Sequence, residues 1–169
     1  RRLMGDTPIN LNSPEQLSWV IYSRKVNDKQ FWAQKVDPYM NDTDFRNLVS
    51  AHTTRMSKTR AVQCRECNGT GYVRKVKKDG TPFAKPNRCV VCDTQGYLFQ
   101  PTNQAAGLRF KPPSAKWASA SGFSTSKNNL AILENAAKKK GSHDTVDFLS
   151  KIRRLSAVET YLSSFVEGI

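Results

Sequence analysis

The sequence predicts an α+β protein, with antiparallel helices and an inserted small β module. Apolar residues recur at helical spacing near both ends of the chain, whereas the middle carries four cysteines in two matching pairs. Basic residues concentrate in the same middle segment, since residues 54–116 hold 13 Lys or Arg against three acids. These observations divide the chain into a helical part, residues 1–24 and 120–169, a helical connector, residues 25–53, and a basic insertion with its linker, residues 54–119.

Composition and charge indicate a folded protein with a polyanionic partner. A chain of 169 residues can bury a core of ordinary size, and a hydrophobic content of 38% argues against disorder. A formal net charge of +13 most often indicates nucleic acid as the partner, and less often an anionic membrane. No apolar stretch approaches the ~18 residues of a membrane span, and the first residues lead into no signal-peptide core. We therefore expect a cytoplasmic protein with no membrane partner, and the lack of an initial Met leads us to expect a piece of a longer chain.

The first helix is predicted to begin at Ser13, a residue type that suits the N-cap position. Pro14 follows at the first helical position, and Gln16 completes a capping box with Ser13. The apolar residues that follow recur at helical spacing and give one apolar face: Leu17, Val20 and Ile21.

The connector is predicted to contain a second short helix, which begins after Asn41 and Asp42. Its apolar residues lie on one side: Phe45, Leu48 and Val49. The region before it, which includes Trp32 and Tyr39, shows no pattern that assigns it to a helix or a strand.

Two further helices are predicted towards the end of the chain. The first follows residues 124–126 and ends near Gly141, which suits a C-cap, and the second is capped by Asp144. The apolar positions of the second recur every three or four residues and are interpreted as core packing: Phe148, Leu149, Ile152, Leu155, Val158, Leu162, Phe165 and Val166. The segment 107–122, with its Pro and Ser residues, is predicted to be the linker that closes the insertion.

The cysteines form the most specific pattern in the chain. Cys64, Cys67, Cys89 and Cys92 follow C-x2-C-x21-C-x2-C, and each half repeats C-x2-C-x3-G-Y. Two thiolates three positions apart on a tight turn can face one ion, and the small residues that follow let backbone N–H groups approach the sulfurs. Two such turns form a closed tetrahedral site with Zn–S distances near ~2.3 Å. The sequence therefore predicts one structural zinc ion per chain.

Other uses of the four cysteines fit this pattern less well. Disulfide bonds are disfavoured in a chain without a signal peptide, and closely spaced C-x2-C pairs suit a metal better. A redox pair and an iron–sulfur centre stay open as alternatives, although neither needs the repeated Gly-Tyr.

The segment between the two cysteine pairs is predicted to be a basic β-hairpin. Residues 72–76 alternate as in a strand, Asp79 and Gly80 form the turn, and Phe83 leads back to the second pair. Six basic side chains on this hairpin favour phosphate contact over a merely solvated loop: Arg74, Lys75, Lys77, Lys78, Lys85 and Arg88.

The chain offers no residues that would form a catalytic site. A metal held by four cysteines has no open coordination position. His52 and His143 suit surface or capping roles, and no Gly-rich phosphate loop precedes a helix. Four acidic residues lie at predicted helix starts, where capping explains them: Asp42, Asp44, Asp144 and Asp147.

Three segments of the helical part match a known set of signatures. Residues 9–17 read INLNSPEQL, residues 122–126 read GFSTS before Leu130 and Leu133, and residues 153–168 read RRLSAVETYLSSFVEG. In this order they resemble the thumb of family A (DNA polymerase I-like) DNA polymerases. That family reads F-N-x-N-S-x-x-Q-L, then G-x-S-T-S before an x-V-L-x-x-L helix, and then the helix that runs towards the palm.

The resemblance implies a thumb subdomain of a phage-like polymerase, which grips primer–template duplex along its phosphates. Hydroxyls and free N–H groups at helix starts suit phosphate contact. The candidate DNA-binding residues outside the hairpin are Asn10, Asn12, Ser13, Ser124, Thr125, Ser126, Lys127, Arg153 and Arg154. The resemblance also implies the remainder of the polymerase as a partner, in a bacterial or phage-infected cell.

The chain departs from the family pattern in three ways. A long insertion separates the first two motifs, where ordinary members have a short connection. Ala157 stands where members often carry Lys, and Tyr161 and Phe165 compete for the aromatic position of the long helix. The palm carboxylates that would hold two magnesium ions lie outside this chain, so we expect it to be inactive alone.

Three roles of the insertion stay open. It can extend the grip on DNA, or it can dock an accessory replication protein through Phe83, Tyr97 and Phe99. A third role is a chaperone-type zinc module, because C-x2-C-x-G-x-G repeats occur in the DnaJ family, although only two half-motifs are present here. A steep salt dependence of duplex binding would separate the first role from the others.

Overall fold

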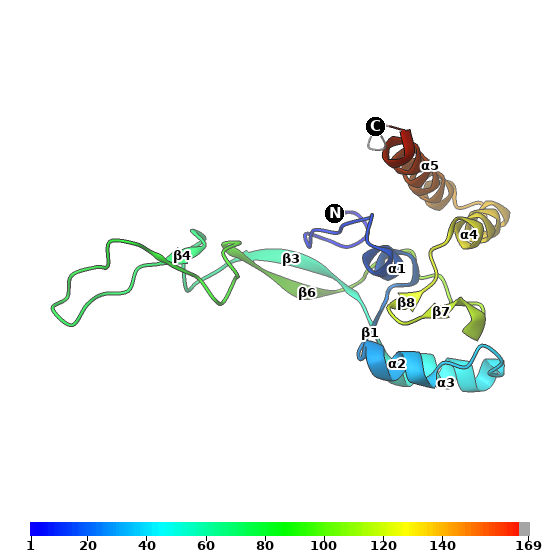
Figure 1. Ribbon diagram of the computed structural model, residues 1–169, viewed down its shortest axis with the longest axis horizontal. Helices are drawn as coiled ribbons and strands as arrows, with labels where there is room; N and C mark the ends of the chain where they lie inside the picture. The colour runs from blue at the N-terminus through cyan, green and yellow to red at the C-terminus, as the bar shows by residue number, and fades with distance from the viewer. Residues whose placement is uncertain (166–169) are drawn as a thin grey trace. The chain divides into compact units, whose positions relative to one another are not determined.

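The protein is a mixed α+β chain, as the sequence predicts, and the computed structural model describes its residues 1–165. Five α-helices and four two-stranded sheets make up this described part (Figure 1). The chain divides into two compact units, which are described separately below. The cysteine unit comprises Arg1–Pro8 and Ser57–Gln104, and the helical unit comprises Ile9–Met56 and Ala105–Ile169. The predicted features at Val166, Glu167 and Gly168 lie outside the described residues.

The helical unit contains the five helices and two short antiparallel sheets. Strand β1 pairs with β2, and β7 pairs with β8. No helix in residues 1–165 is long and apolar enough to cross a membrane. The elements in chain order are α1 (Pro14–Tyr22), β1 (Arg24–Val26), α2 (Lys29–Lys35), α3 (Asp42–His52), β2 (Thr53–Arg55), the 3-10 turn η1 (Ala115–Trp117), β7 (Ala118–Ser119), β8 (Gly122–Phe123), α4 (Lys127–Lys139) and α5 (His143–Phe165).

Side-chain caps fix where the helices begin. Ser13 caps α1 by accepting a hydrogen bond from the Gln16 N–H at 3.4 Å, with Pro14 at the first position. The Gln16 side chain, however, accepts from the Asn10 N–H at 2.8 Å, so the predicted capping box is closed three residues further upstream than expected. Helix α3 begins at Asp42, one residue before the predicted start, and Asn41 caps it by accepting from two backbone N–H groups.

The connector is an integral part of the helical unit. Helix α2, which the sequence did not reveal, is capped by Asp28 and buries Trp32 completely. The Trp32 indole N–H donates to the Ser119 carbonyl at 2.7 Å. Strand β1 then pairs with β2 at the end of α3, which ties the connector to the residues that follow α1.

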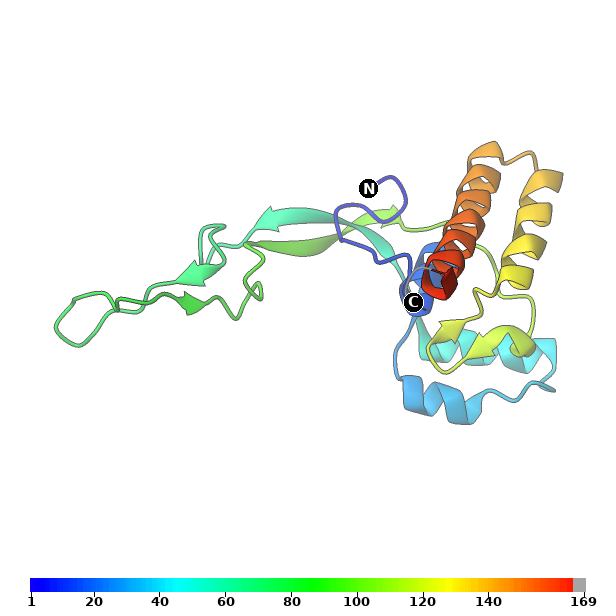
Figure 2. The same cartoon turned by 45° about the horizontal axis from the view of Figure 1, so that its top comes forward.

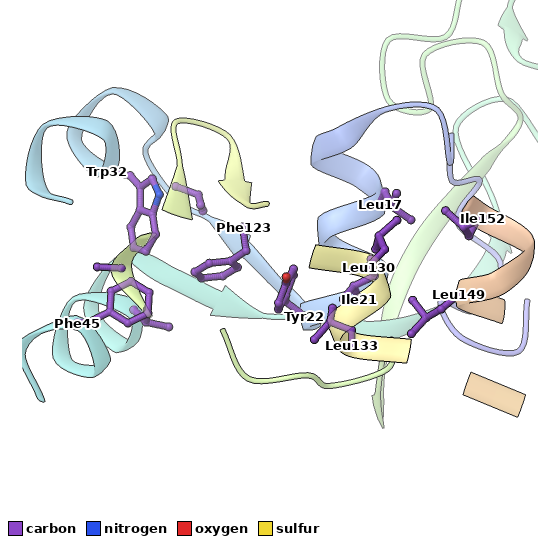
Figure 3. Close-up of a cluster of buried hydrophobic side chains, with 13 residues drawn as sticks. Leu17, Ile21, Tyr22, Trp32, Phe45, Phe123, Leu130, Leu133, Leu149 and Ile152 are labelled. Atoms are coloured by element: carbon purple, nitrogen blue, oxygen red, sulfur yellow. The ribbon is translucent and has the colours of Figure 1, made fainter. Parts of the chain in front are cut away.

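One hydrophobic core holds the helical unit together (Figure 3). Phe123 lies between Tyr22 and Trp32, with ring centroids 5.1 Å and 5.6 Å away. The buried Tyr22 hydroxyl donates to the Ser124 carbonyl at 2.9 Å, and burial raises its pKa. Aliphatic side chains from α1, α4 and α5 add to the core: Leu17, Ile21, Leu130, Leu133, Leu149 and Ile152. The remaining buried members are Val26, Phe45, Val49 and Ala115.

The segment predicted to be a linker packs on this core instead. The N–H groups of Leu108 and Phe110 donate to the carbonyls of Val20 and Ile21 in α1, at 2.8 and 3.0 Å. Ala115 is buried, and residues 105–119 belong to the helical unit rather than to the insertion. The prediction of a linker was wrong because Pro and Ser also occur in irregular segments whose backbone is satisfied by hydrogen bonds to a helix end.

Helices α4 and α5 lie side by side and run antiparallel (Figure 2). Gly141, at φ 68°, ends α4 as predicted. The apolar stripe of α5 is only half buried: Leu149 and Ile152 are in the core, but Leu155 is 42% exposed and Phe165 69% exposed. Core packing along the whole stripe was therefore a wrong expectation, because α4 covers only the first half of α5.

The cysteine unit is built from two paired ribbons. Strand β3 (Ser57–Gln63) pairs with β6 (Tyr97–Ala105), and β4 (Tyr72–Val73) pairs with β5 (Asn87–Arg88) (Figure 2). The sequence predicted the second pairing and its turn, where Gly80 has φ 82°. It did not predict the first pairing, or that residues 1–8 join this unit by hydrogen bonds such as the one from the Asp6 N–H to the Thr59 carbonyl.

Candidate metal centre

The four cysteines meet in one buried cluster. Every sulfur lies within 4.8 Å of the other three, with 3.8 Å between Cys64 and Cys89 and 3.6 Å between Cys67 and Cys92. Four sulfurs placed tetrahedrally at ~2.3 Å from a zinc ion would be about 3.8 Å apart. Sulfurs in a disulfide bond are ~2.05 Å apart, and all four cysteines are free thiols. The cluster is therefore a candidate metal site of the closed four-sulfur type.

Two copies of one turn, offset by 25 residues, build this site. The Cys64 N–H donates to the Gly96 carbonyl at 2.8 Å, and the Cys89 N–H donates to the Gly71 carbonyl at 2.9 Å. Each turn thus holds the first cysteine of the other turn. The repeated sequence C-x2-C-x3-G-Y therefore encodes a pair of turns with approximate twofold symmetry.

The glycine before the tyrosine of each turn is required because a side chain there would clash and because its backbone is left-handed. Gly71 and Gly96 have φ of 78° and 76°, and a Cβ atom on either would lie 2.3 Å from a carbonyl oxygen of the opposite turn. Their N–H groups donate to the Cys67 and Cys92 sulfurs at 3.3 Å. A side chain at either position would displace the N–H group that stabilises the sulfur.

At one of the left-handed positions, only the first turn has a glycine. The first turn has Gly69 there, with φ 83°, whereas the second has Thr94 with φ 64°. A β-branched residue is strained in this region, since left-handed backbone costs an L-residue about 1–2 kcal/mol. The second turn therefore carries strain that the first turn lacks.

We expect Thr94→Gly to stabilise the cysteine unit by about 0.5–1 kcal/mol, because removing the strain outweighs the extra backbone entropy of glycine. Gly69→Ala at the equivalent position should destabilise it, since its Cβ would lie 2.9 Å from the Gln63 amide nitrogen in a left-handed backbone. Urea titration of the cobalt-loaded chain, followed by the thiolate–cobalt absorption, measures both effects. Equal shifts in the same direction would show that the two positions are not conformationally equivalent.

The Cys67 and Cys92 thiols have pKa values shifted in opposite directions. Burial raises the pKa of the Cys67 thiol. Hydrogen bonds with the Gly71 N–H and the neighbouring thiols of Cys92 and Cys64 outweigh this effect and lower the pKa to about 7. Burial and the neighbouring sulfurs raise the pKa of Cys92 to about 12, against the opposing effect of the Gly96 N–H. Once one thiolate has formed, its charge opposes the next ionisation. A divalent cation at the centre removes this opposition, so the donor set fits a metal ion.

The residues proposed from sequence to contact DNA fall into two separate groups. Those of the hairpin 72–88, here called the basic finger, are all exposed, and its tip turns as predicted. Those of the helical unit lie at the starts of α1 and α4 and on α5. Asn10 and Ser13 are engaged in local caps at α1, and Ser126 caps α4 by accepting from the Asn129 N–H.

Two neighbouring arginines of α5 differ in their surroundings. Arg153 forms an ion pair with the buried Glu134 of α4 at 2.8 Å, whereas Arg154 is exposed. Hydrogen bonds from Lys138 and then Arg153 hold the pKa of Glu134 below its usual range. The sequence did not reveal this pairing, which gives Arg153 a part in holding α4 against α5.

The sequence does not show that a further group of basic residues comes together in the fold. Arg24, Arg46, Arg55, Arg109 and Lys111 line a cavity of the helical unit together with Asp42. They come from four separate segments, and only the register of β1 against β2 brings Arg24 opposite Arg55. These residues could have been grouped from the sequence only if the pairing of β1 with β2 had been predicted.

The ligand set of the candidate metal site is the one that the sequence predicts. Its sulfurs come from two turns of a single compact unit, so the site is complete within this chain. No protein-family model, no curated protein and no solved structure matches the chain.

Proposed function

We propose that this chain is the thumb region of a phage-like family A DNA polymerase, in which a zinc-stabilised insertion extends the grip on primer–template duplex. The observation that carries the proposal is the basic finger, which presents six Lys or Arg and a single acid. The thumb-like motifs at residues 9–17 and 122–126 give the polymerase context. The chain has no catalytic role of its own in this proposal, and magnesium belongs to the palm.

Zinc is the metal proposed for the four cysteines. Four thiolates in tetrahedral arrangement are typical of zinc or of iron–sulfur chemistry. The two sulfur pairs, at 3.6 and 3.8 Å, have the spacing expected around a single zinc ion. With every coordination position filled by the protein, the ion has a structural role.

The charge of the basic finger is available to a phosphate backbone. Among the described residues, none of the six basic side chains of the finger forms an ion pair. Its one acid, Asp79, accepts hydrogen bonds from the backbone N–H and the hydroxyl of Thr81, which lower its pKa and fix the turn. Unpaired cations on an exposed hairpin favour contact with phosphates without sequence preference.

The helical unit would contribute contacts at its helix starts. Ser124, Thr125 and Ser126 precede α4, and Asn12 and Ser13 precede α1, so hydroxyl, amide and N–H groups gather at these two ends. Such groups position a duplex by its phosphates. Lys127 and Arg154 add exposed positive charge, whereas the pairing of Arg153 with Glu134 makes it the weakest of these candidates.

We expect replacement of Lys75, Lys77 and Lys78 by Ala to flatten the salt dependence of duplex binding. Each phosphate contact contributes about 0.9 to the slope of log K against log salt, so the slope should fall by roughly two to three units. Fluorescence anisotropy with a labelled duplex at several salt concentrations measures the slope. The matched control replaces three exposed lysines of the helical unit, at positions 116, 139 and 140, by Ala, and its slope should stay close to that of the unchanged chain.

In the complete polymerase, the same triple replacement should shorten the product made per binding event and leave single-nucleotide addition nearly unchanged. The finger would then act on processivity and not on chemistry. Equal slopes for the triple variant, its control and the unchanged chain would rule out phosphate contact by these lysines.

A second candidate function is the docking of an accessory replication protein by the insertion. Exposed apolar side chains favour it, since Val90 is 91% exposed, Tyr97 50% and Phe83 46%, whereas Phe99 is partly covered. A chaperone-type zinc module would bind its partners through the same exposed apolar side chains. An unchanged salt slope together with loss of processivity in a Val90→Ser, Phe83→Ser variant would support protein docking over DNA contact.

A further inference from the structure

The helical unit contains a partly open cavity whose lining combines positive charge with aromatic rings. Its volume is about 660 Å³, within the range of small-molecule sites. Five basic residues and one acid contribute to the lining, and they are here called the arginine cluster: Arg24, Arg46, Arg55, Arg109, Lys111 and Asp42. Phe110 supplies the accessible aromatic part, since Tyr22 and Phe45, which also line the cavity, are each only 2% exposed.

The fold holds like charges together at this cavity. Arg24 and Arg55 are direct cross-strand partners in the register of β1 and β2, an arrangement that is destabilising for like charges. Arg24 is partly buried and donates a hydrogen bond to the Thr53 hydroxyl at 2.8 Å; burial and then Arg55 lower its pKa. Among residues 1–165, none of the five basic side chains of the cluster forms an ion pair. An anion in the cavity would relieve this repulsion.

The backbone that carries Arg109 and Phe110 to the cavity is held firmly. Arg109 has φ 60°, a left-handed conformation that costs a residue with a side chain free energy. Its N–H donates to the Ser23 hydroxyl at 3.0 Å, and the Phe110 N–H donates to the Ile21 carbonyl at 3.0 Å. Strained backbone kept in place by such bonds is typical of ligand sites.

We propose that this cavity binds a nucleotide, with its phosphate on the arginine cluster and its base against Phe110 and the neighbouring prolines. Guanidinium groups suit phosphate because their planar forks donate paired hydrogen bonds, and bases stack on apolar and aromatic faces. Asp42, the one acid of the cavity, is available to accept hydrogen bonds from a base or sugar. The source of the nucleotide is a free mononucleotide or a single nucleic-acid strand, which share this chemistry. The site lies wholly in the helical unit, so it does not depend on the function proposed for the basic finger.

The test is calorimetric titration of the full chain with three probes: dAMP, inorganic phosphate, and a single-stranded tetramer of deoxyadenosine. Arg55→Gln should weaken binding of the nucleotide probe about tenfold or more, the loss expected from one charge-assisted hydrogen bond. Without any probe the same variant should melt at an equal or higher temperature, because the repulsion with Arg24 is gone. Lys139→Gln, an equal change of charge on α4 outside the cavity, should leave binding unchanged.

The probes separate the possible outcomes. Saturable binding of dAMP that is lost in Arg55→Gln supports a free nucleotide, and binding of the tetramer alone with the same loss supports a strand. Inorganic phosphate binding as tightly as dAMP would overturn the role of Phe110 and the neighbouring prolines. No saturable binding of any probe, or equal affinity in Arg55→Gln, would overturn the site. The Lys75, Lys77 and Lys78 replacements leave this cavity intact. The variant that carries them should therefore still bind the nucleotide probe, so the cavity proposal and the proposal for the basic finger can fail independently.

Discussion

Removal of the zinc ion that we propose for the four cysteines should unfold the cysteine unit and leave the helical unit folded. The buried cluster of the cysteine unit consists of the four cysteines, with Val73 and Leu98 packed against them as partly buried apolar residues, and Met4 adds one more buried apolar side chain to the unit. So small a core cannot offset the entropy of ordering the strands. Structural zinc supplies about 10–16 kcal/mol in small metal-dependent domains, which is far more than this unit could lose and stay folded.

The folding of the two units can be measured separately in this experiment. All three tryptophans, Trp19, Trp32 and Trp117, belong to the helical unit, so tryptophan emission follows that unit alone. Chelation, or Cys64→Ser, should abolish the amide protection of residues 57–104 in hydrogen exchange while the tryptophan emission and its melting stay unchanged. A Cys64–Cys67 disulfide, or protein purified without chelators that contains no zinc by elemental analysis, would contradict the assignment of the metal.

The cysteine site was predictable because its information is local and repeated. Each turn is specified within nine residues, and the two copies agree at the cysteines, the second glycine and the tyrosine. The first glycine of the first turn, Gly69, is replaced by Thr94 in the second turn, and Thr94 has a left-handed backbone. The hairpin turn at Asp79 and Gly80 was predictable for the same reason, since turn chemistry is decided by adjacent residues.

The arrangement of the helical unit was less predictable because it depends on distant residues. Trp32 is fully buried, yet no apolar periodicity surrounds it, since its partners Phe123 and the Ser119 carbonyl come from the far side of the insertion. The pairing of residues 1–8 with β3 is likewise a contact between remote segments. Tertiary contacts of this kind leave no local signal.

Helix α5 shows the opposite failure, in which a clear pattern predicted too much burial. Its apolar residues recur regularly, but the surface of α4 ends before they do, so the later ones are exposed: Leu155, Val158, Tyr161, Leu162 and Phe165. Periodicity states which face of a helix is apolar. It does not state how far along the helix a partner extends.

Phe123→Ala should destabilise the helical unit by about 3–5 kcal/mol, as expected for a phenylalanine removed from a close-packed core. Phe123 is 2% exposed and contacts both Tyr22 and Trp32, so its loss leaves a cavity between α1 and α2 that neither ring can fill alone. The matched control is Phe165→Ala, the same chemical change at a side chain that is 69% exposed, which should alter stability by less than about 0.5 kcal/mol. Urea unfolding followed by tryptophan emission measures both. A comparable loss at Phe165 would mean that the second half of α5 is covered in solution, and the apolar stripe would then be core along its whole length, as the sequence alone indicated.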